Sequence, residues 1–334
     1  GLVDTLIYKN DVRDYLKSLV GIDKDDNMPI LGIQDMVNVK KNVPRDKSGN
    51  VIAVYYAYGE IDGSASATTG EGINSEKLIK DLRKLKDDEN IKAVVLRVNS
   101  PGGSAYGSEQ IWHAVSQLKK EKPVIVSMGD YAASGGYYIS CNADTIVAEP
   151  TTLTGSIGIF GMIPNAKELT DKLGLNFDVV KTNPHADFGS LTRPMNESEK
   201  GLMQMYVNNG YKLFLTRCSD GRSISMEELD KMAQGRVWTG STAKELGLVD
   251  ELGGLDKALE IAIAKTGVDA YTIMNYPKKE SLFENLMNTH PGNYIKSRML
   301  NGKMSDIYRQ FSIIENFDKI DRIQARIPFE LNIQ

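Results

Sequence analysis

Apolar, β-branched runs alternate with helical segments in the middle of the chain, and this alternation constrains the fold more than any other feature. Strands are predicted at Val51–Ile61, Ile91–Val98 and Pro123–Met128, which are rich in Val, Ile, Leu and aromatic residues. Apolar residues at helical spacing lie between them over Ser75–Leu85 and Ala105–Leu118. Strands that alternate with helices form right-handed βαβ crossovers, so the sequence predicts an α/β fold with a mainly parallel sheet.

The pattern continues in shorter elements to about residue 275. Further strands are expected at Thr145–Val147, Ile157–Met162 and Phe177–Val180, and further helices at Lys167–Leu173, Glu197–Thr216, Met226–Ala233 and Leu255–Thr266. We therefore expect one α/β domain over residues 51–275, followed by residues 276–334 as a packing or oligomerisation extension.

A repeated sequence near the start suggests how residues 1–50 relate to this domain. Gly1–Leu6 reads GLVDTL, and Gly247–Leu252 reads GLVDEL. The later copy closes the predicted α/β region, so the first is interpreted as the tail of an equivalent, preceding repeat. Residues 21–50 are polar and loop-like, as expected of a linker.

Composition and motifs exclude several classes of function. The chain has 334 residues and a net charge of −4, so it lacks the basic excess of a nucleic-acid-binding surface. It has no apolar run of 18 residues, and its two cysteines form no disulfide framework. No metal-binding or nucleotide-binding motif occurs, so neither a metal nor a cofactor is expected.

Two glycine pairs follow predicted strand ends and carry the strongest signal for chemistry. Ser100-Pro101-Gly102-Gly103 comes after one strand, and Ser134-Gly135-Gly136 comes after the next. Glycines let the backbone turn its N–H groups outward, where they can stabilise a developing oxyanion. Ser134 precedes a predicted helix and is either an N-cap or a nucleophile. The second glycine loop favours the nucleophile, because a cap needs no oxyanion hole opposite it.

Four segments in this order resemble the S49 family of serine peptidases, in particular its long, two-repeat signal peptide peptidases. They are VNSPGG from Val98, AASGGYY from Ala132, LTGSIG from Leu153 and GRVWTG from Gly235. The resemblance covers about residues 50–265 and implies a ClpP/crotonase-like fold of stacked ββα units. It also implies a Ser/Lys dyad that cleaves leftover signal peptides and other hydrophobic peptides.

The same resemblance assigns the site residues. It implies that Ser134 is the nucleophile, that Ser156 hydrogen-bonds the general-base lysine, and that the N–H groups of Gly103 and Gly135 form the oxyanion hole, with Gly102 as a less certain neighbour. A lysine base must be neutral, which requires burial in an apolar site.

The lysine itself is missing from the position that the short family members use. Ala186 stands there. In the long members the lysine lies in the N-terminal repeat, so the resemblance implies that an absent repeat supplies it. Lys181 and His185 are alternative bases within this chain, each with a competing interpretation as an ordinary surface residue.

Two other functions remain open at this stage. One is a crotonase-like acyl-CoA enzyme that uses the paired N–H groups for a thioester enolate, although Glu109 and Asp130 are the only acidic residues near the glycine loops. The other is a catalytically inactive scaffold or binding module.

The family resemblance further implies peptide partners, a ring-shaped homo-oligomer, and a parent protein anchored to the bacterial inner membrane with its domain on the periplasmic or outer face.

Overall fold

We describe a computed structural model of the chain, which covers Thr5, residues 7–8, 11–23, 25–30, 48–63, 72–278 and 323–326. Two compact units are distinguished, residues 1–45 and residues 46–334. In the first unit, helix α1 (Val12–Val20) ends at Gly21, which has the left-handed φ of 71° typical of a glycine C-cap. No helix within the described ranges is long and apolar enough to cross a membrane.

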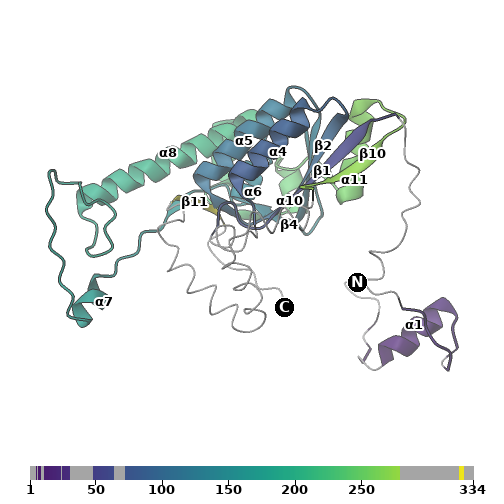
Figure 1. Cartoon of the computed structure of the whole chain (residues 1–334), viewed down its shortest axis with the longest axis horizontal. Helices are drawn as coiled ribbons and strands as arrows, with labels where there is room; N and C mark the ends of the chain where they lie inside the picture. The colour runs from purple at the N-terminus through teal and green to yellow at the C-terminus, as the bar shows by residue number, and fades with distance from the viewer. Residues whose placement is uncertain are drawn as a thin grey trace, which may run out of the picture. The chain divides into compact units, whose positions relative to one another are not determined.

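The second unit alternates strands and helices as the sequence predicts (Figure 1). Its strands are β1 (Val51–Tyr58), β2 (Ile91–Ser100), β3 (Gly102–Ser104), β4 (Val124–Ala133), β5 (Thr145–Ala148), β6 (Leu153–Gly155), β7 (Phe160–Gly161), β8 (Val237–Thr239), β9 (Glu251–Leu252), β10 (Thr272–Tyr276) and β11 (Ile323–Arg326). Its helices are α4 (Ser75–Asp87), α5 (Ala105–Lys119), α6 (Gly135–Tyr138), α7 (Lys167–Lys172), α8 (Glu197–Arg222), α9 (Met226–Met232), α10 (Gly240–Glu245) and α11 (Leu255–Thr266).

The main sheet has the strand order β10-β1-β2-β4-β5-β9, and these neighbours pair in parallel. Strand β6 adds in parallel to the end of β4, and β8 pairs with β6 in the antiparallel direction. The predicted α/β fold with a mainly parallel sheet is therefore confirmed. The carboxyl ends of β2, β4 and β6 meet at one edge of this sheet, where sites form in parallel α/β folds.

Each strand contributes side chains to two cores because successive residues face opposite sides. On one face, Ala53 and Tyr55 of β1 pack in a core with Leu78 and Leu82 of α4. The other face of the sheet is covered by α11, where two core positions are alanines. Each fully buried leucine contributes about 1.5–3 kcal/mol relative to an exposed one, so these faces fix the sheet on which the site is built.

A second, smaller sheet lies beside the main one. Its order is β3-β11-β7, with β11 between two short strands and antiparallel to both. Gln324 pairs with Ser104 on one side and with Phe160 on the other. The sequence pattern predicts neither β11 nor the edge strand β10.

One predicted strand is absent. Phe177–Val180 has a strand-like composition but no strand pairing in the structure, and Val180 is 99% exposed. The segment follows α7 in a part of the molecule where it meets no strand edge among the described residues, so its backbone has no ladder to join. The segment from Phe160 to Tyr206, which includes α7 and the start of α8, is called the arm below (Figure 1).

Candidate active site

Ser134 lies at a sharp turn between β4 and α6. Its backbone has φ 54° and ψ −116°, a region that residues with a Cβ rarely adopt. Its side chain makes no N-cap hydrogen bond, although it stands at the N-cap position. The N-cap interpretation of Ser134 therefore fails, and the strained turn resembles the backbone that presents a nucleophilic serine in other hydrolases.

Ser156 leaves the neighbouring strand at the same edge. Strands β4 and β6 are parallel with Ala133 opposite Gly155, and the Ser134 N–H donates to the Gly155 carbonyl at 2.8 Å. Ser156 also has a left-handed φ, 48°, and its N–H donates to the backbone carbonyl of Arg236 at 2.7 Å. Ser134 and Ser156 are 1% and 2% exposed. The register thus places these two buried hydroxyl-bearing residues side by side.

The first glycine loop packs directly on α6. A Cβ added to Gly135 would lie 3.0 Å from Gly102 Cα, and one added to Gly136 would lie 2.7 Å from the Ser100 carbonyl oxygen. Gly103 has φ 155°, and a Cβ there would collide with the backbone of Ile61. Only glycine allows this approach, so the two predicted glycine loops do come together in space.

The Gly103 N–H points away from Ile61, with which the glycine strand β3 forms a parallel bridge. The two residues that flank Gly103 both bond to Ile61. The Ser104 N–H donates to the Ile61 carbonyl, and the Ile61 N–H donates to the Gly102 carbonyl. Successive residues of a strand direct their N–H and C=O groups to opposite edges. The N–H and C=O of Gly103 therefore face β11, where Ala325 is its partner.

Strand β11 consequently lies over the candidate site. A Cβ on Gly135 would be 2.8 Å from the Ala325 carbonyl oxygen, and Ala325 is completely buried. Gly135 begins α6, so its N–H has no acceptor within the helix. The backbone that carries both predicted oxyanion donors, the N–H groups of Gly103 and Gly135, therefore lies next to the Ala325 carbonyl group. Sequence reasoning missed Ala325, because a four-residue strand near the chain end carries no periodic signal.

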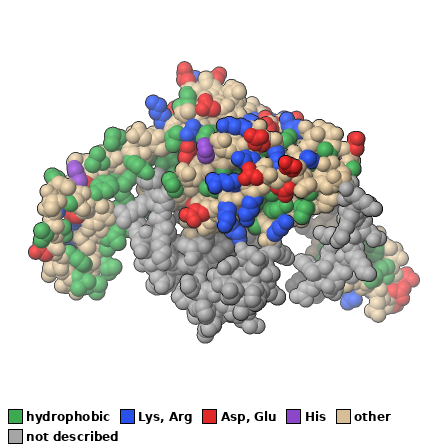
Figure 2. Space-filling model, turned by 45° about the horizontal axis from the view of Figure 1, so that its top comes forward, with side chains coloured by type: hydrophobic (Ala, Val, Ile, Leu, Met, Phe, Trp, Pro, Cys, Tyr) green, Lys and Arg blue, Asp and Glu red, His purple; other side chains and the backbone are tan. Residues whose placement is uncertain are grey.

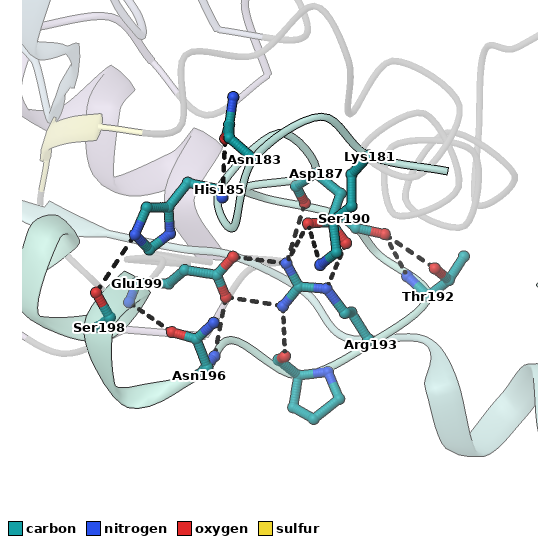
Figure 3. A network of polar contacts seen from close by, with 11 residues as sticks. Lys181, Asn183, His185, Asp187, Ser190, Thr192, Arg193, Asn196, Ser198 and Glu199 are labelled. Carbon is teal, nitrogen blue, oxygen red and sulfur yellow. Dashed lines mark hydrogen bonds and ion pairs between the residues drawn. The ribbon is translucent and has the colours of Figure 1, made fainter. Parts of the chain in front are cut away.

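The loop that holds the position of the missing lysine is organised by charge (Figure 3). Arg193 Nε lies 2.7 Å from Asp187 Oδ2, and Arg193 Nη1 lies 2.7 Å from Glu199 Oε2. These bonds hold the pKa of Asp187 well below its ordinary value, and they lower that of Glu199 from 4.5 to about 2, with help from the Asn196 N–H. These bonds connect the loop of residues 181–193 to Glu199 in the first turn of α8.

Neither alternative base contacts the candidate nucleophile. Lys181 Nζ pairs with Asp187 Oδ1 at 2.9 Å, and His185 Nε2 lies 3.4 Å from Ser198 Oγ. His185 Nδ1 is buried without a hydrogen-bond partner among the described residues. Both side chains belong to the charged loop of the arm rather than to the turn that bears Ser134.

The acidic residues considered for a crotonase-like reaction are placed differently. Glu109 accepts hydrogen bonds from Tyr138 Oη at 2.7 Å and from Arg217 Nη2 at 2.6 Å, so its carboxylate is already engaged. Asp130 is exposed on β4. In the described part of the chain no group of three or more His, Cys, Asp or Glu side chains is arranged to hold a metal ion.

Several known proteins and two family models resemble the chain. The model of peptidase family S49 matches residues 116–270, and that of Clp protease matches residues 65–151. The chain is 39% identical to Protease 4 of Salmonella typhi over 294 residues, which are 87% of this chain and 46% of that protein. A ClpP1 variant of Listeria monocytogenes aligns with 62% of this chain and 94% of its own, at 17% identity and a TM-score of 0.41.

Similarity also extends to a protein of nearly the chain's own size. A protein of Methanocaldococcus jannaschii is 35% identical over 228 residues, which are 68% of this chain and 72% of that protein. The longer relatives differ in that the chain spans only 40–46% of their length. From the matched family model and the relatives, the chain belongs to the S49 family of serine peptidases.

Proposed function

We propose that the chain carries the nucleophile and the oxyanion hole of a Ser/Lys endopeptidase that cleaves leftover signal peptides and other hydrophobic peptides. Ser134 attacks the peptide carbonyl, and Ser156 hydrogen-bonds the lysine that accepts the Ser134 proton. The N–H groups of Gly103 and Gly135 stabilise the tetrahedral oxyanion. The observation that carries the proposal is the strained Ser134 turn, packed on the glycine loop and without a capping bond.

The position of β11 supports a peptide substrate. β3 and β7 leave room between them for one extended chain, which pairs with both in the antiparallel direction. Main-chain pairing of this kind binds extended peptides without demanding a particular sequence. The same groove gives the crotonase-like alternative no support, because a thioester substrate offers no strand to pair.

The general base comes, in this proposal, from a lysine outside residues 1–334. Lys181 and His185 are held in the arm, and Ala186 has no titratable group. The longer relatives have more than twice the length that the chain spans. The proposed parent protein is anchored to the bacterial inner membrane and acts on its periplasmic or outer side.

We also propose that the arm is where the site-bearing unit meets a second copy or a homologous repeat in a ring. Leu169, Leu173, Phe177 and Val180 are between 54% and 99% exposed, and apolar side chains gather on this part of the molecule (Figure 2). In the complete gene product, Val180→Glu should lower the mass measured by light scattering, because it places a charge in the proposed contact. Ile273→Glu, on the edge strand β10, should leave the mass unchanged. Equal masses for the wild type and both variants would contradict this assignment.

The catalytic assignment is tested by hydrolysis of a hydrophobic peptide ester by the complete gene product. Ser134→Ala should lower kcat at least about 10³-fold, because it removes the nucleophile. Ser156→Ala should lower it less, since it removes only a partner of the base. The matched control is Ser190→Ala in the arm, which should retain full activity. Activity that survives Ser134→Ala would overturn the proposed function.

A further inference from the structure

A second group of residues, behind the nucleophile, ties the two halves of the candidate site together. The group consists of Tyr138 on α6, Glu109 and Trp112 on α5, and Phe214 and Arg217 on α8. Helix α6 follows Ser134, and α5 follows the glycine strand β3. Any group that fixes α6 against α5 therefore also fixes Ser134 against Gly103.

The connection from Tyr138 to Ser134 is direct. The Tyr138 N–H donates to the Ser134 carbonyl at 2.8 Å and closes the first turn of α6. A residue at the φ and ψ of Ser134 costs about 1–3 kcal/mol and persists only where its surroundings hold it. Because α6 has four residues, it cannot hold that turn by its own hydrogen bonds.

The side chain of Tyr138 is held at both its ring and its hydroxyl. The ring stacks on Phe214 with centroids 4.1 Å apart, and the hydroxyl donates to Glu109 Oε2 at 2.7 Å. Burial, together with this bond to a carboxylate, raises the pKa of Tyr138 far above its ordinary value, so the phenol remains a donor.

Glu109 is fixed in turn by Arg217. Arg217 donates to Glu109 Oε1 at 2.6 Å and to Oε2 at 3.3 Å, and its guanidinium lies 4.0 Å from the centre of the Trp112 ring. The side chains of this ion pair are 26% and 22% exposed. An ion pair with this much solvent contact contributes little to the stability of the whole fold.

On this basis we propose that Glu109 is a positioning residue for the peptidase reaction: held by Arg217, it fixes Tyr138 and thereby the Ser134 turn opposite Gly103. The inference rests on the proposed function of Ser134. It predicts a separation of two effects, since loss of the Glu109–Tyr138 bond displaces the nucleophile but leaves most of the fold intact. A misplacement of 1 Å can lower a rate about 10²-fold.

The test compares Glu109→Gln and Tyr138→Phe in the complete gene product. We expect kcat for the peptide ester to fall about tenfold or more in each, because the attack geometry is lost. KM should change less than about twofold, because the substrate groove between β3 and β7 is untouched. The double variant should resemble either single variant, as members of one network do. The unfolding midpoint should stay within about 3 °C of the wild type.

The matched control is Asp144→Asn. Asp144 is also a partly exposed carboxylate (25%), and it pairs with Lys119 at the other end of α5. This variant should leave kcat unchanged. Equal losses in Asp144→Asn and Glu109→Gln, or a fall in rate that follows unfolding, would overturn the positioning role.

Amide hydrogen exchange tests the same role without any activity. The Tyr138 amide should exchange faster in Glu109→Gln and Tyr138→Phe than in the wild type or Asp144→Asn, since its acceptor is the Ser134 carbonyl. Unchanged exchange would overturn the proposal even if the enzyme is active. Conversely, the variants could show faster exchange while hydrolysis by the wild type does not depend on Ser134. That result would support the link from Glu109 through Tyr138 to the Ser134 turn and would reject the proposed function.

Discussion

At the scale of single residues, the main finding is that Ser134 combines backbone strain with a side chain that makes no N-cap hydrogen bond. The sequence places a serine before two glycines at a strand end, which is enough to predict either a cap or a nucleophile. It does not predict φ 54°, because that angle results from the packing of α6 on the glycine loop. The missing cap bond is likewise visible only in the structure.

This strain gives a prediction that compares the stabilities of two Ser134 variants. Ser134→Gly should have a free energy of unfolding about 1 kcal/mol larger than Ser134→Ala, because glycine adopts positive φ freely and alanine does not. Denaturant unfolding of both variants measures the difference. If the alanine variant were equally stable or more stable, the Ser134 turn would not be strained in solution.

At the scale of elements, the large strands and helices and a few short ones, such as β5 and α9, could be predicted from the sequence, whereas short strands such as β3 and β11 could not. Continuous apolar runs identify β2 and β4, and leucine spacing identifies α4. β3 and β11 have three and four residues and form because each meets partners that are distant in sequence: β3 pairs with β11, and β11 also pairs with β7. The prediction of a strand at Phe177–Val180 was wrong for the same reason, since a strand needs a partner as well as a composition.

Strand β11 carries a prediction about access to the groove. β11 occupies the groove between β3 and β7, so we expect substrate to bind only to molecules from which β11 has moved away. Removal of residues 323–334 from the complete gene product should therefore lower KM for a peptide ester, by about tenfold if one wild-type molecule in ten has an open groove. A synthetic peptide with the sequence of residues 320–329 should then compete with the substrate, and a scrambled peptide should not. An unchanged KM after the deletion would show that β11 does not occupy the substrate groove.

The charged loop of the arm carries a prediction about acid. The pKa of Glu199 is lowered from 4.5 to about 2, so the stabilisation it provides is complete above about pH 4.5 and is lost as the pH falls toward 2. Pepsin should therefore cleave residues 181–196 increasingly over this interval. Glu199→Gln should be cleaved throughout it, and Glu197→Gln, a 90% exposed neighbour, should behave as the wild type. Equal protection of all three proteins would contradict the role of the network.

At the scale of the whole molecule, Lys181 and His185, the two alternative bases, are held in the arm and do not contact Ser134, the proposed nucleophile. The order of the four motifs predicts both the family and the convergence of Ser134, Gly103 and Ser156, because these residues follow the carboxyl ends of β4, β2 and β6, which are adjacent and parallel. In the proposed function the proton acceptor is a lysine of a preceding repeat. The repeated GLVD segments and Ala186 at the lysine position are the sequence features that suggest it.

This predicts a large difference between two proteins. Residues 1–334 alone should hydrolyse a hydrophobic peptide ester at least about 10³-fold more slowly than the complete gene product, because a serine without its base loses most of its reactivity. Replacement of the lysine that we propose in the corresponding loop of a preceding repeat should reduce the complete product to the same level. Robust turnover by residues 1–334 that survives Lys181→Ala would exclude an external base.

The most direct test of the account is the site at which a serine-directed fluorophosphonate reacts with the complete gene product. The adduct is mapped by mass spectrometry of proteolytic fragments, in the wild type and in Ser134→Ala. We predict one adduct, on Ser134, which forms with the loss of peptidase activity and is absent from the variant. An adduct on another serine that accompanies the loss of activity, or full activity without any adduct on Ser134, would contradict the account.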